Sequence, residues 1–156
     1  MLTLTAKSED ETAKIGATLA DTLGAGDVLL LSGELGAGKT TLARALIRRR
    51  AGAPIDVPSP TFALVEPYAF DVPLVHVDLY RLEGPEQIVE LGLDDALEVG
   101  ITIVEWPERA SSFFTGPRLD IAIGHRRGEG RVITLTPHGE SWLRRIEALA
   151  SGPLAL

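Results

Sequence analysis

Apolar side chains recur at helical spacing in several stretches of the chain. Residues 8–23 place Leu19 and Leu23 four positions apart, and Ser8 is a suitable N-terminal cap because its side-chain oxygen can accept from a free backbone N–H. The glycines that follow favour an end to this helix. By the same spacing we predict helices over residues 41–50, 85–97 and 140–150.

Strands are predicted from two other patterns. Continuous apolar runs at residues 28–31 and 101–104 are typical of strands that are buried on both faces, whereas residues 73–82 alternate in polarity. A proline-rich loop at 57–62 leads into an extended segment up to residue 68, and residues 119–123 and 131–136 read as a hairpin. Strands alternating with helices indicate an α/β fold, in which helices flank a mostly parallel central sheet and an antiparallel hairpin is added near the C-terminus.

The composition excludes several classes of function. A formal net charge of −7 argues against a protein that holds nucleic acid by itself, because such binding needs a basic face. The chain has no cysteine, which excludes disulfides, thiolate nucleophiles and zinc–thiolate sites. No apolar run approaches the roughly 20 residues that span a bilayer, and residues 1–7 lack the features of a secretory signal. We expect one cytoplasmic domain over residues 1–156, without a membrane segment or strong direct binding of nucleic acid.

Residues 33–40 form a glycine-rich motif that can hold a triphosphate. The sequence GELGAGKT fits the pattern G-x-x-x-x-G-K-[ST], with a buried strand predicted before it and a helix after it. Backbone N–H groups of such a loop point at phosphate oxygens, and the helix that follows directs its positive end at the same anion. Lys39 would reach the β- and γ-phosphates, and the Thr40 hydroxyl would bind Mg²⁺. The motif therefore predicts a P-loop NTPase-like sandwich whose loop contacts the nucleotide through Gly33, Leu35, Gly36, Ala37, Gly38, Lys39, Thr40 and Thr41.

Two acidic residues at or near strand ends are candidates for the hydrolytic chemistry. Glu105 closes the run at 101–104, and Asp78 shares a strand face with His76 and Tyr80. In a parallel sheet, both carboxylates would lie at the same edge as the ligand. The next residue, Trp106, could either stack on a purine or cap the core. The three histidines lack metal-ligand spacing, so surface or hydrogen-bonded roles are favoured for them.

Missing elements exclude other nucleotide-binding classes. A GTPase that reads guanine through Asn-Lys-x-Asp is excluded because the chain has no asparagine, and the Leu-Ser-Gly-Gly-Gln signature of transporter ATPases is also missing. A small-molecule P-loop kinase is the alternative, with the arginine-bearing segment 126–130 as a short candidate lid. A nucleotide-binding scaffold with incidental catalysis is a third possibility.

The ordered set GELGAGKTT, SPTFALVEPY, HVDLYRL and VEWPER resembles one family. This is the bacterial ATPase family required for threonylcarbamoyladenosine formation in tRNA, the TsaE or YjeE type, and the resemblance extends over essentially the whole chain. It implies weak Mg²⁺-dependent hydrolysis of ATP to ADP. It also implies a partner, the TsaB–TsaD complex, which modifies adenosine 37 of ANN-decoding tRNAs, so that contact with tRNA is indirect.

The same resemblance implies roles for individual residues. Thr40 and Glu105 would bind Mg²⁺, Asp78 would be needed for hydrolysis, and Lys39 completes the catalytic set with Asp78 and Glu105. The Ser-Pro-Thr segment behaves like a switch in the family, which makes Thr61 a candidate contact to the nucleotide or the metal. Further nucleotide contacts implied by the resemblance are Trp106, Glu9, Glu108 and Arg127.

Overall fold

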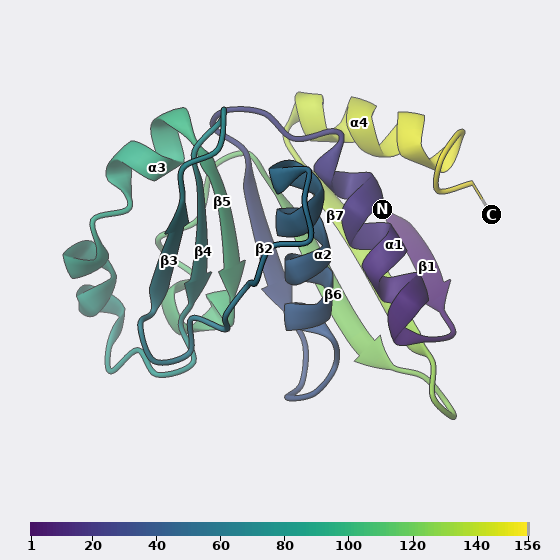
Figure 1. Cartoon of the computed structure of the whole chain (residues 1–156), viewed down its shortest axis with the longest axis horizontal. Coiled ribbons are helices and arrows are strands. Elements are labelled where there is room, and N and C mark those ends of the chain that lie inside the picture. Colours follow the sequence, from purple (N-terminus) through teal and green to yellow (C-terminus); the bar gives the residue numbers. More distant parts are fainter. Residues whose placement is uncertain (156) are drawn as a thin grey trace.

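In the computed structural model, which describes residues 1–155, helices pack on both faces of a seven-stranded sheet (Figure 1). The strands are β1 Leu2–Ala6, β2 Val28–Ser32, β3 Val65–Tyr68, β4 Leu74–Asp78, β5 Ile101–Glu105, β6 Arg118–His125 and β7 Arg131–His138. Their order across the sheet is β1-β7-β6-β2-β5-β4-β3. The central strands β6, β2, β5 and β4 are parallel, as predicted, whereas β1, β7 and β3 are antiparallel to their neighbours. The sheet is therefore mixed, with antiparallel strands at both edges.

The α-helices are α1 Glu9–Ala20, α2 Lys39–Ala51, α3 Asp94–Val99 and α4 Glu140–Ala150, and two short 3-10 helices, η1 Pro85–Leu91 and η2 Pro107–Ala110, accompany them. Of the α-helices, α1, α2 and α4 agree with the predicted segments to within a few residues. Ser8 caps α1 as expected, because its Oγ accepts from the backbone N–H of Glu11 at 3.2 Å. No helix within residues 1–155 is both long and apolar enough to cross a bilayer.

The single helix predicted over residues 85–97 is wrong. The segment divides into η1 and α3 because Gly92, between them, has φ 65°, a left-handed conformation that ends a helix. The N-terminal strand β1 was not predicted either. Within the described residues, its strand partner is β7, which lies more than 120 residues later in the sequence (Leu2 pairs with Leu135). No local signal therefore specifies this strand.

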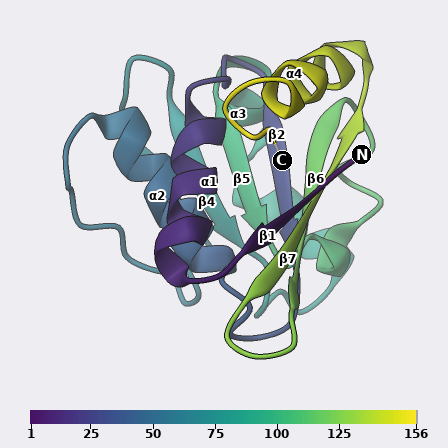
Figure 2. The same cartoon turned by 90° about the vertical axis from the view of Figure 1, so that its right-hand side faces the viewer.

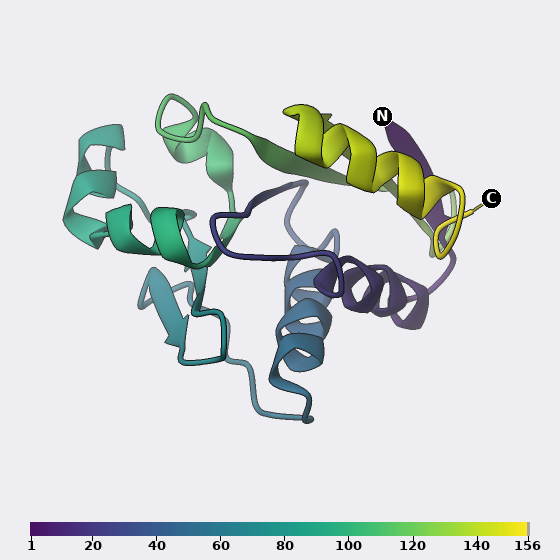
Figure 3. The ribbon, with the colours of Figure 1, turned by 90° about the horizontal axis from the view of Figure 1, so that it is seen from above.

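The central strand β2 divides the core into two layers because successive side chains of a strand point to opposite faces. Leu29 and Leu31 pack with α1 and α2, whereas Val28 and Leu30 pack with the side of η1, α3 and η2. Helices α1 and α2 lie side by side on their face (Figure 2), and seen from above they lie apart from α3 (Figure 3). Helix α4 lies across the end of the sheet opposite the loop between β2 and α2 (Figure 1). That loop end is the part of the fold that carries the candidate site.

Candidate active site

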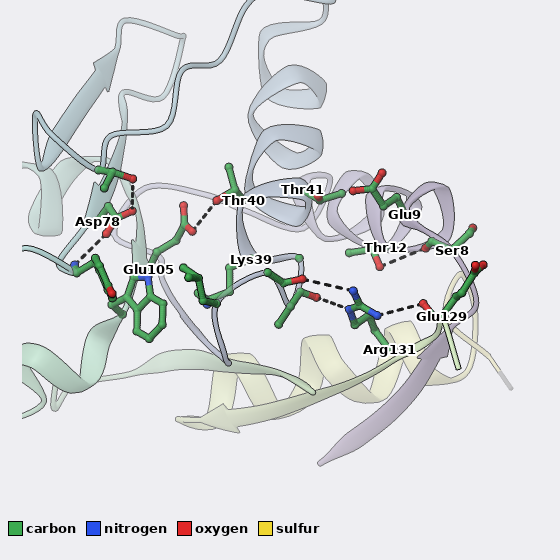
Figure 4. A pocket seen from close by; sticks show the side chains of 17 residues that line it. Ser8, Glu9, Thr12, Lys39, Thr40, Thr41, Asp78, Glu105, Glu129 and Arg131 are labelled. Atoms are coloured by element: carbon green, nitrogen blue, oxygen red, sulfur yellow. Dashed lines mark hydrogen bonds between the residues drawn. The ribbon is translucent and has the colours of Figure 1, made fainter. Parts of the chain in front are cut away.

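The predicted loop and both predicted acids converge at the carboxyl ends of β2, β4 and β5. In register across the sheet, Leu31 lies beside Glu105 and Glu105 beside Asp78. A cavity of about 330 Å³ opens here, and Figure 4 shows the side chains that line it. Its lining residues are Ser8, Glu9, Thr12, Leu35, Gly36, Ala37, Gly38, Lys39, Thr40, Thr41, Thr61, Asp78, Tyr80, Glu105, Trp106, Glu129 and Arg131.

The glycine-rich loop (residues 33–38) connects β2 to the first turn of α2. Gly33 has φ 146° and lies so close to β6 that a Cβ there would clash with the carbonyl oxygen of Ile123. Gly38 has φ 112° and is the N-cap of α2, so the free N–H groups of that helix end face the cavity. A residue other than glycine would be strained at either position. The curvature of the loop and the start of the helix therefore depend on these two glycines.

Lys39 lies across the glycine-rich loop. Its Nζ donates to the carbonyl oxygens of Gly33 at 2.6 Å and Glu34 at 2.9 Å, and it lies 4.0 Å from the centroid of the Trp106 ring. Burial lowers the pKa of Lys39 below its ordinary value, opposed by the negative charges of Glu105, Glu108 and Asp78. The side chain is thus a desolvated cation, held close to where an anion would bind.

Trp106 is held in a backbone conformation that is uncommon for a residue with a side chain. Its φ of 59° lies in the left-handed region, which costs on the order of 1–3 kcal/mol for a non-glycine residue. The turn directs the indole into the cavity, where it contacts Lys39 and lies 4.9 Å from the Tyr80 ring between centroids. Such strain at the wall of a cavity suggests a functional requirement for this ring position.

Glu105, the last residue of β5, contacts both Thr40 at the start of α2 and His76 on β4. Its Oε1 accepts from the Thr40 hydroxyl at 2.9 Å, and its Oε2 lies 2.6 Å from Nε2 of His76 (Figure 4 shows the first of these bonds). Glu105 is only 2% exposed and His76 is fully buried. A carboxylate beside a threonine hydroxyl supplies the hard oxygen ligands that Mg²⁺ prefers. The two residues predicted to bind the metal therefore lie side by side.

Asp78 lies beside Glu105, on the neighbouring strand β4. Its Oδ1 accepts from the backbone N–H of Tyr80 at 2.9 Å, and its Oδ2 accepts from the Thr61 hydroxyl at 3.2 Å. The Thr61 hydroxyl also lies 2.8 Å from that of Ser59. The loop that was predicted to behave as a switch is thus hydrogen-bonded to a predicted catalytic acid. A rearrangement of this loop would change the surroundings of Asp78.

Three of the predicted nucleotide contacts do not line the cavity. Gly33, the first residue of the glycine-rich loop, lies against β6, and Glu108 is exposed on η2, from where only its charge reaches Lys39. Arg127 is exposed near the tip of the β6–β7 hairpin. The hairpin arginine that does line the cavity is Arg131, the first residue of β7.

Arg131 was missed because nothing in the sequence distinguishes it from its neighbours. Its Nε donates to the carbonyl oxygen of Ala37 at 2.9 Å, and its guanidinium also contacts that of Gly36 at 3.4 Å. Ser8 and Thr12, also missed, lie one helical turn apart at the start of α1, beside the predicted Glu9. A helix N-terminus carrying hydroxyl groups was the available signal for these two.

The chain is similar to proteins of one named family. A sequence model of the family described as threonylcarbamoyl adenosine biosynthesis protein TsaE matches residues 6–133. A Streptomyces coelicolor protein named tRNA threonylcarbamoyladenosine biosynthesis protein TsaE is 44% identical over 137 residues, which covers 83% of this chain and 92% of the relative. A Rickettsia conorii protein of the same name is 37% identical over 139 residues, covering 88% of this chain and 79% of the relative.

The fold is also similar to that of a solved structure. The crystal structure of Bacillus subtilis YdiB superposes with a TM-score of 0.78 at 27% identity, covering 97% of this chain and 95% of that one. The sequence model extends from the last residue of β1 into β7 and includes the glycine-rich loop, Asp78 and Glu105. The chain therefore belongs to the TsaE family.

Proposed function

We propose that this chain is an Mg²⁺-dependent, weakly hydrolysing ATPase that acts in threonylcarbamoyladenosine biosynthesis in tRNA. Residues 1–156 would form one P-loop ATPase domain. The observation that carries the proposal is the convergence of the glycine-rich loop, Asp78 and Glu105 on one cavity. The names of the relatives supply the pathway, and they favour this function over that of a small-molecule kinase.

In the proposed reaction, the loop amides and Lys39 bind the β- and γ-phosphates of ATP. Lys39 would exchange the carbonyl oxygens of Gly33 and Glu34 for phosphate oxygens, which replaces neutral hydrogen-bond acceptors with charged ones. Thr40 and Glu105 would hold Mg²⁺, which offsets the phosphate charge when bound. Mg²⁺ usually takes one or two protein ligands together with phosphate oxygens, so a hydroxyl and a carboxylate that are 2.9 Å apart fit this ion.

Asp78 would act on the attacking water. Its carboxylate is 3% exposed and is held by Tyr80 and Thr61, so its orientation is set before a substrate arrives. We propose that Asp78 orients this water and that Thr61 reports occupancy of the site through its hydrogen bond to Asp78. Hydrolysis would then change the conformation of the 57–62 loop.

We further propose that a TsaB–TsaD type complex responds to this conformational change. That complex transfers the threonylcarbamoyl group to adenosine 37 of ANN-decoding tRNAs. A net charge of −7 agrees with a subunit that contacts tRNA only through its partners. Hydrolysis would reset that complex between turnovers.

The proposal is tested by measuring ATP turnover with and without the TsaB–TsaD complex, in the wild type and in Asp78→Asn and Glu105→Ala. We expect stimulation by the complex, and a loss of roughly 100-fold or more in each variant, since each removes a group from the reacting centre. Asp71→Asn, an exposed aspartate outside the cavity, is the matched control and should keep wild-type turnover. Full activity in both variants, or turnover that ignores the complex, would contradict the proposal.

A further inference from the structure

His76 is a buried polar residue for which neither the fold nor the ligand cavity gives a reason. It lies on β4 between Leu74 and Asp78, on the face of the sheet that packs against α2, and it is fully buried. It does not line the cavity. Any effect of His76 on the cavity would therefore act through a neighbouring residue.

Packing alone favours an apolar residue at this position. The Nδ1 atom of His76 is buried and has no hydrogen-bond partner among residues 1–155. A buried polar atom without a partner destabilises the folded state. Leu74, two residues earlier on the same face, shows that an aliphatic side chain suits these surroundings. A histidine at this position therefore lowers the stability of the fold relative to an aliphatic residue.

The contact of the other ring nitrogen of His76 gives a reason for a histidine at this position. Nε2 lies 2.6 Å from Oε2 of Glu105, while Oε1 of Glu105 accepts from Thr40. A carboxylate can only accept, so Nε2 is the donor towards an ionised Glu105. The terminal torsion of a glutamate is broad, and a carboxylate held by one oxygen alone can rotate. With both oxygens bonded, the plane of the Glu105 carboxylate is fixed.

We infer that His76 is a positioning residue, which holds Glu105 so that Oε1 faces Thr40 and the Mg²⁺ that accompanies the nucleotide. This inference rests on the proposed function, because it requires Glu105 to bind a metal. Partners behind a metal ligand orient it and commonly change metal affinity by about 10–100-fold when removed. Loss of His76 should therefore weaken nucleotide binding when Mg²⁺ is present and leave the affinity without Mg²⁺ unchanged.

The test is calorimetric titration of the full chain with the ATP analogue AMP-PNP, in excess MgCl₂ and in EDTA. We expect His76→Leu to weaken binding about 10-fold or more in MgCl₂ and to match the wild type in EDTA. His76→Gln, whose amide can donate at a similar reach, should restore most of the Mg²⁺-dependent gain. Should the leucine variant fail to fold, His76→Phe, which is closer in shape to histidine, replaces it.

Val77→Ala is the matched control for lost stability, since Val77 is the next residue on β4, equally buried but pointing to the opposite face. It should lower the melting temperature and keep the full Mg²⁺ response. A wild-type Mg²⁺ response in His76→Leu would overturn the inference while leaving the proposed function intact. Loss of that response in His76→Gln as well as in His76→Leu would also overturn it, because a donor would then not be what matters. If the wild type itself bound AMP-PNP equally in MgCl₂ and EDTA, the proposed function would fail first.

Discussion

At the scale of single residues, the site is organised around a cation that is removed from water. Lys39 is 5% exposed, with two carbonyl oxygens and the Trp106 ring around its ammonium group. These groups stabilise the charge only in part, because burial outweighs the neighbouring acids and lowers the pKa of Lys39. An arriving phosphate would supply the missing negative charge. The surroundings of Lys39 therefore fit the proposed binding of a phosphate.

The lowered pKa of Lys39 makes a prediction about stability and pH. The unfolded chain keeps the lysine proton up to about 10.5, whereas the folded chain loses it at lower pH. Between these two values the unfolded state binds more protons, so the contribution of Lys39 to the free energy of unfolding rises with pH. We expect the difference in this free energy, wild type minus Lys39→Met, to increase from neutral pH toward 10.5 in urea titrations. Lys14→Met, at an exposed position of α1, controls for removal of a lysine charge, and a falling difference would refute the prediction.

At the scale of elements, the β6–β7 hairpin supports the glycine-rich loop. Arg131 at the start of β7 donates to the carbonyl oxygens of Ala37 and Gly36, and also to that of Glu129 within the hairpin (Figure 4). It donates to the carbonyl oxygen of Gly130 as well. In a trans peptide the C=O and the following N–H point in opposite directions, so a carbonyl that faces Arg131 directs the next N–H away from Arg131. The guanidinium thus helps to orient loop amides, and it joins two elements that are 94 residues apart in the chain.

The hairpin contact predicts that Arg131→Met weakens ATP binding by about 10-fold, since hydrogen bonds to a charged donor contribute about 1.5–3 kcal/mol and only part of this reaches the ligand. Fluorescence or calorimetric titration with AMP-PNP would measure the effect. Arg127→Met, at an exposed position on the same hairpin, should leave the affinity unchanged. Equal effects of the two substitutions would mean that the general charge of the hairpin, and not its contact with the loop, sets the affinity.

The elements also show what the sequence could predict. The loop, Lys39, Thr40, Asp78 and Glu105 follow from motif and strand-end position, which are local properties. Alternation correctly placed His76 and Asp78 on one face, but it could not reveal that α2 buries this face, because alternation says which residues point together and not what covers them. For the same reason, only the register of β6 and β7 shows that Arg131, and not Arg127, faces the loop.

At the scale of the whole molecule, the two ends of the sheet serve different purposes. The candidate active site lies at the carboxyl ends of the parallel strands, and α4 lies at the other end (Figure 1). There Arg145 of α4 forms a bidentate ion pair with Asp27, just before β2, at 2.6 and 2.9 Å. Arg145 also donates to the carbonyl oxygen of Thr22 and stacks over Trp142 at 4.0 Å. This contact joins the last helix to the strand that carries the glycine-rich loop at its far end.

The ion pair between Arg145 and Asp27 is therefore expected to stabilise the fold without affecting ligand binding. Asp27 is 9% exposed in its side chain, so Arg145→Met leaves a buried carboxylate with only the backbone N–H of Gly24 as a partner in the described part of the chain and should lower the free energy of unfolding by about 2 kcal/mol. Denaturant titration measures this loss, and AMP-PNP affinity should stay at the wild-type value. Asp27→Asn combined with Arg145→Met should cost less than the sum of the single changes, because the two residues are in contact. Arg49→Met, which removes an exposed ion pair with Asp21, should have a much smaller effect. Additive losses would show that the two side chains do not stabilise each other. A change in AMP-PNP affinity would show instead that α4 is coupled to the site across the sheet.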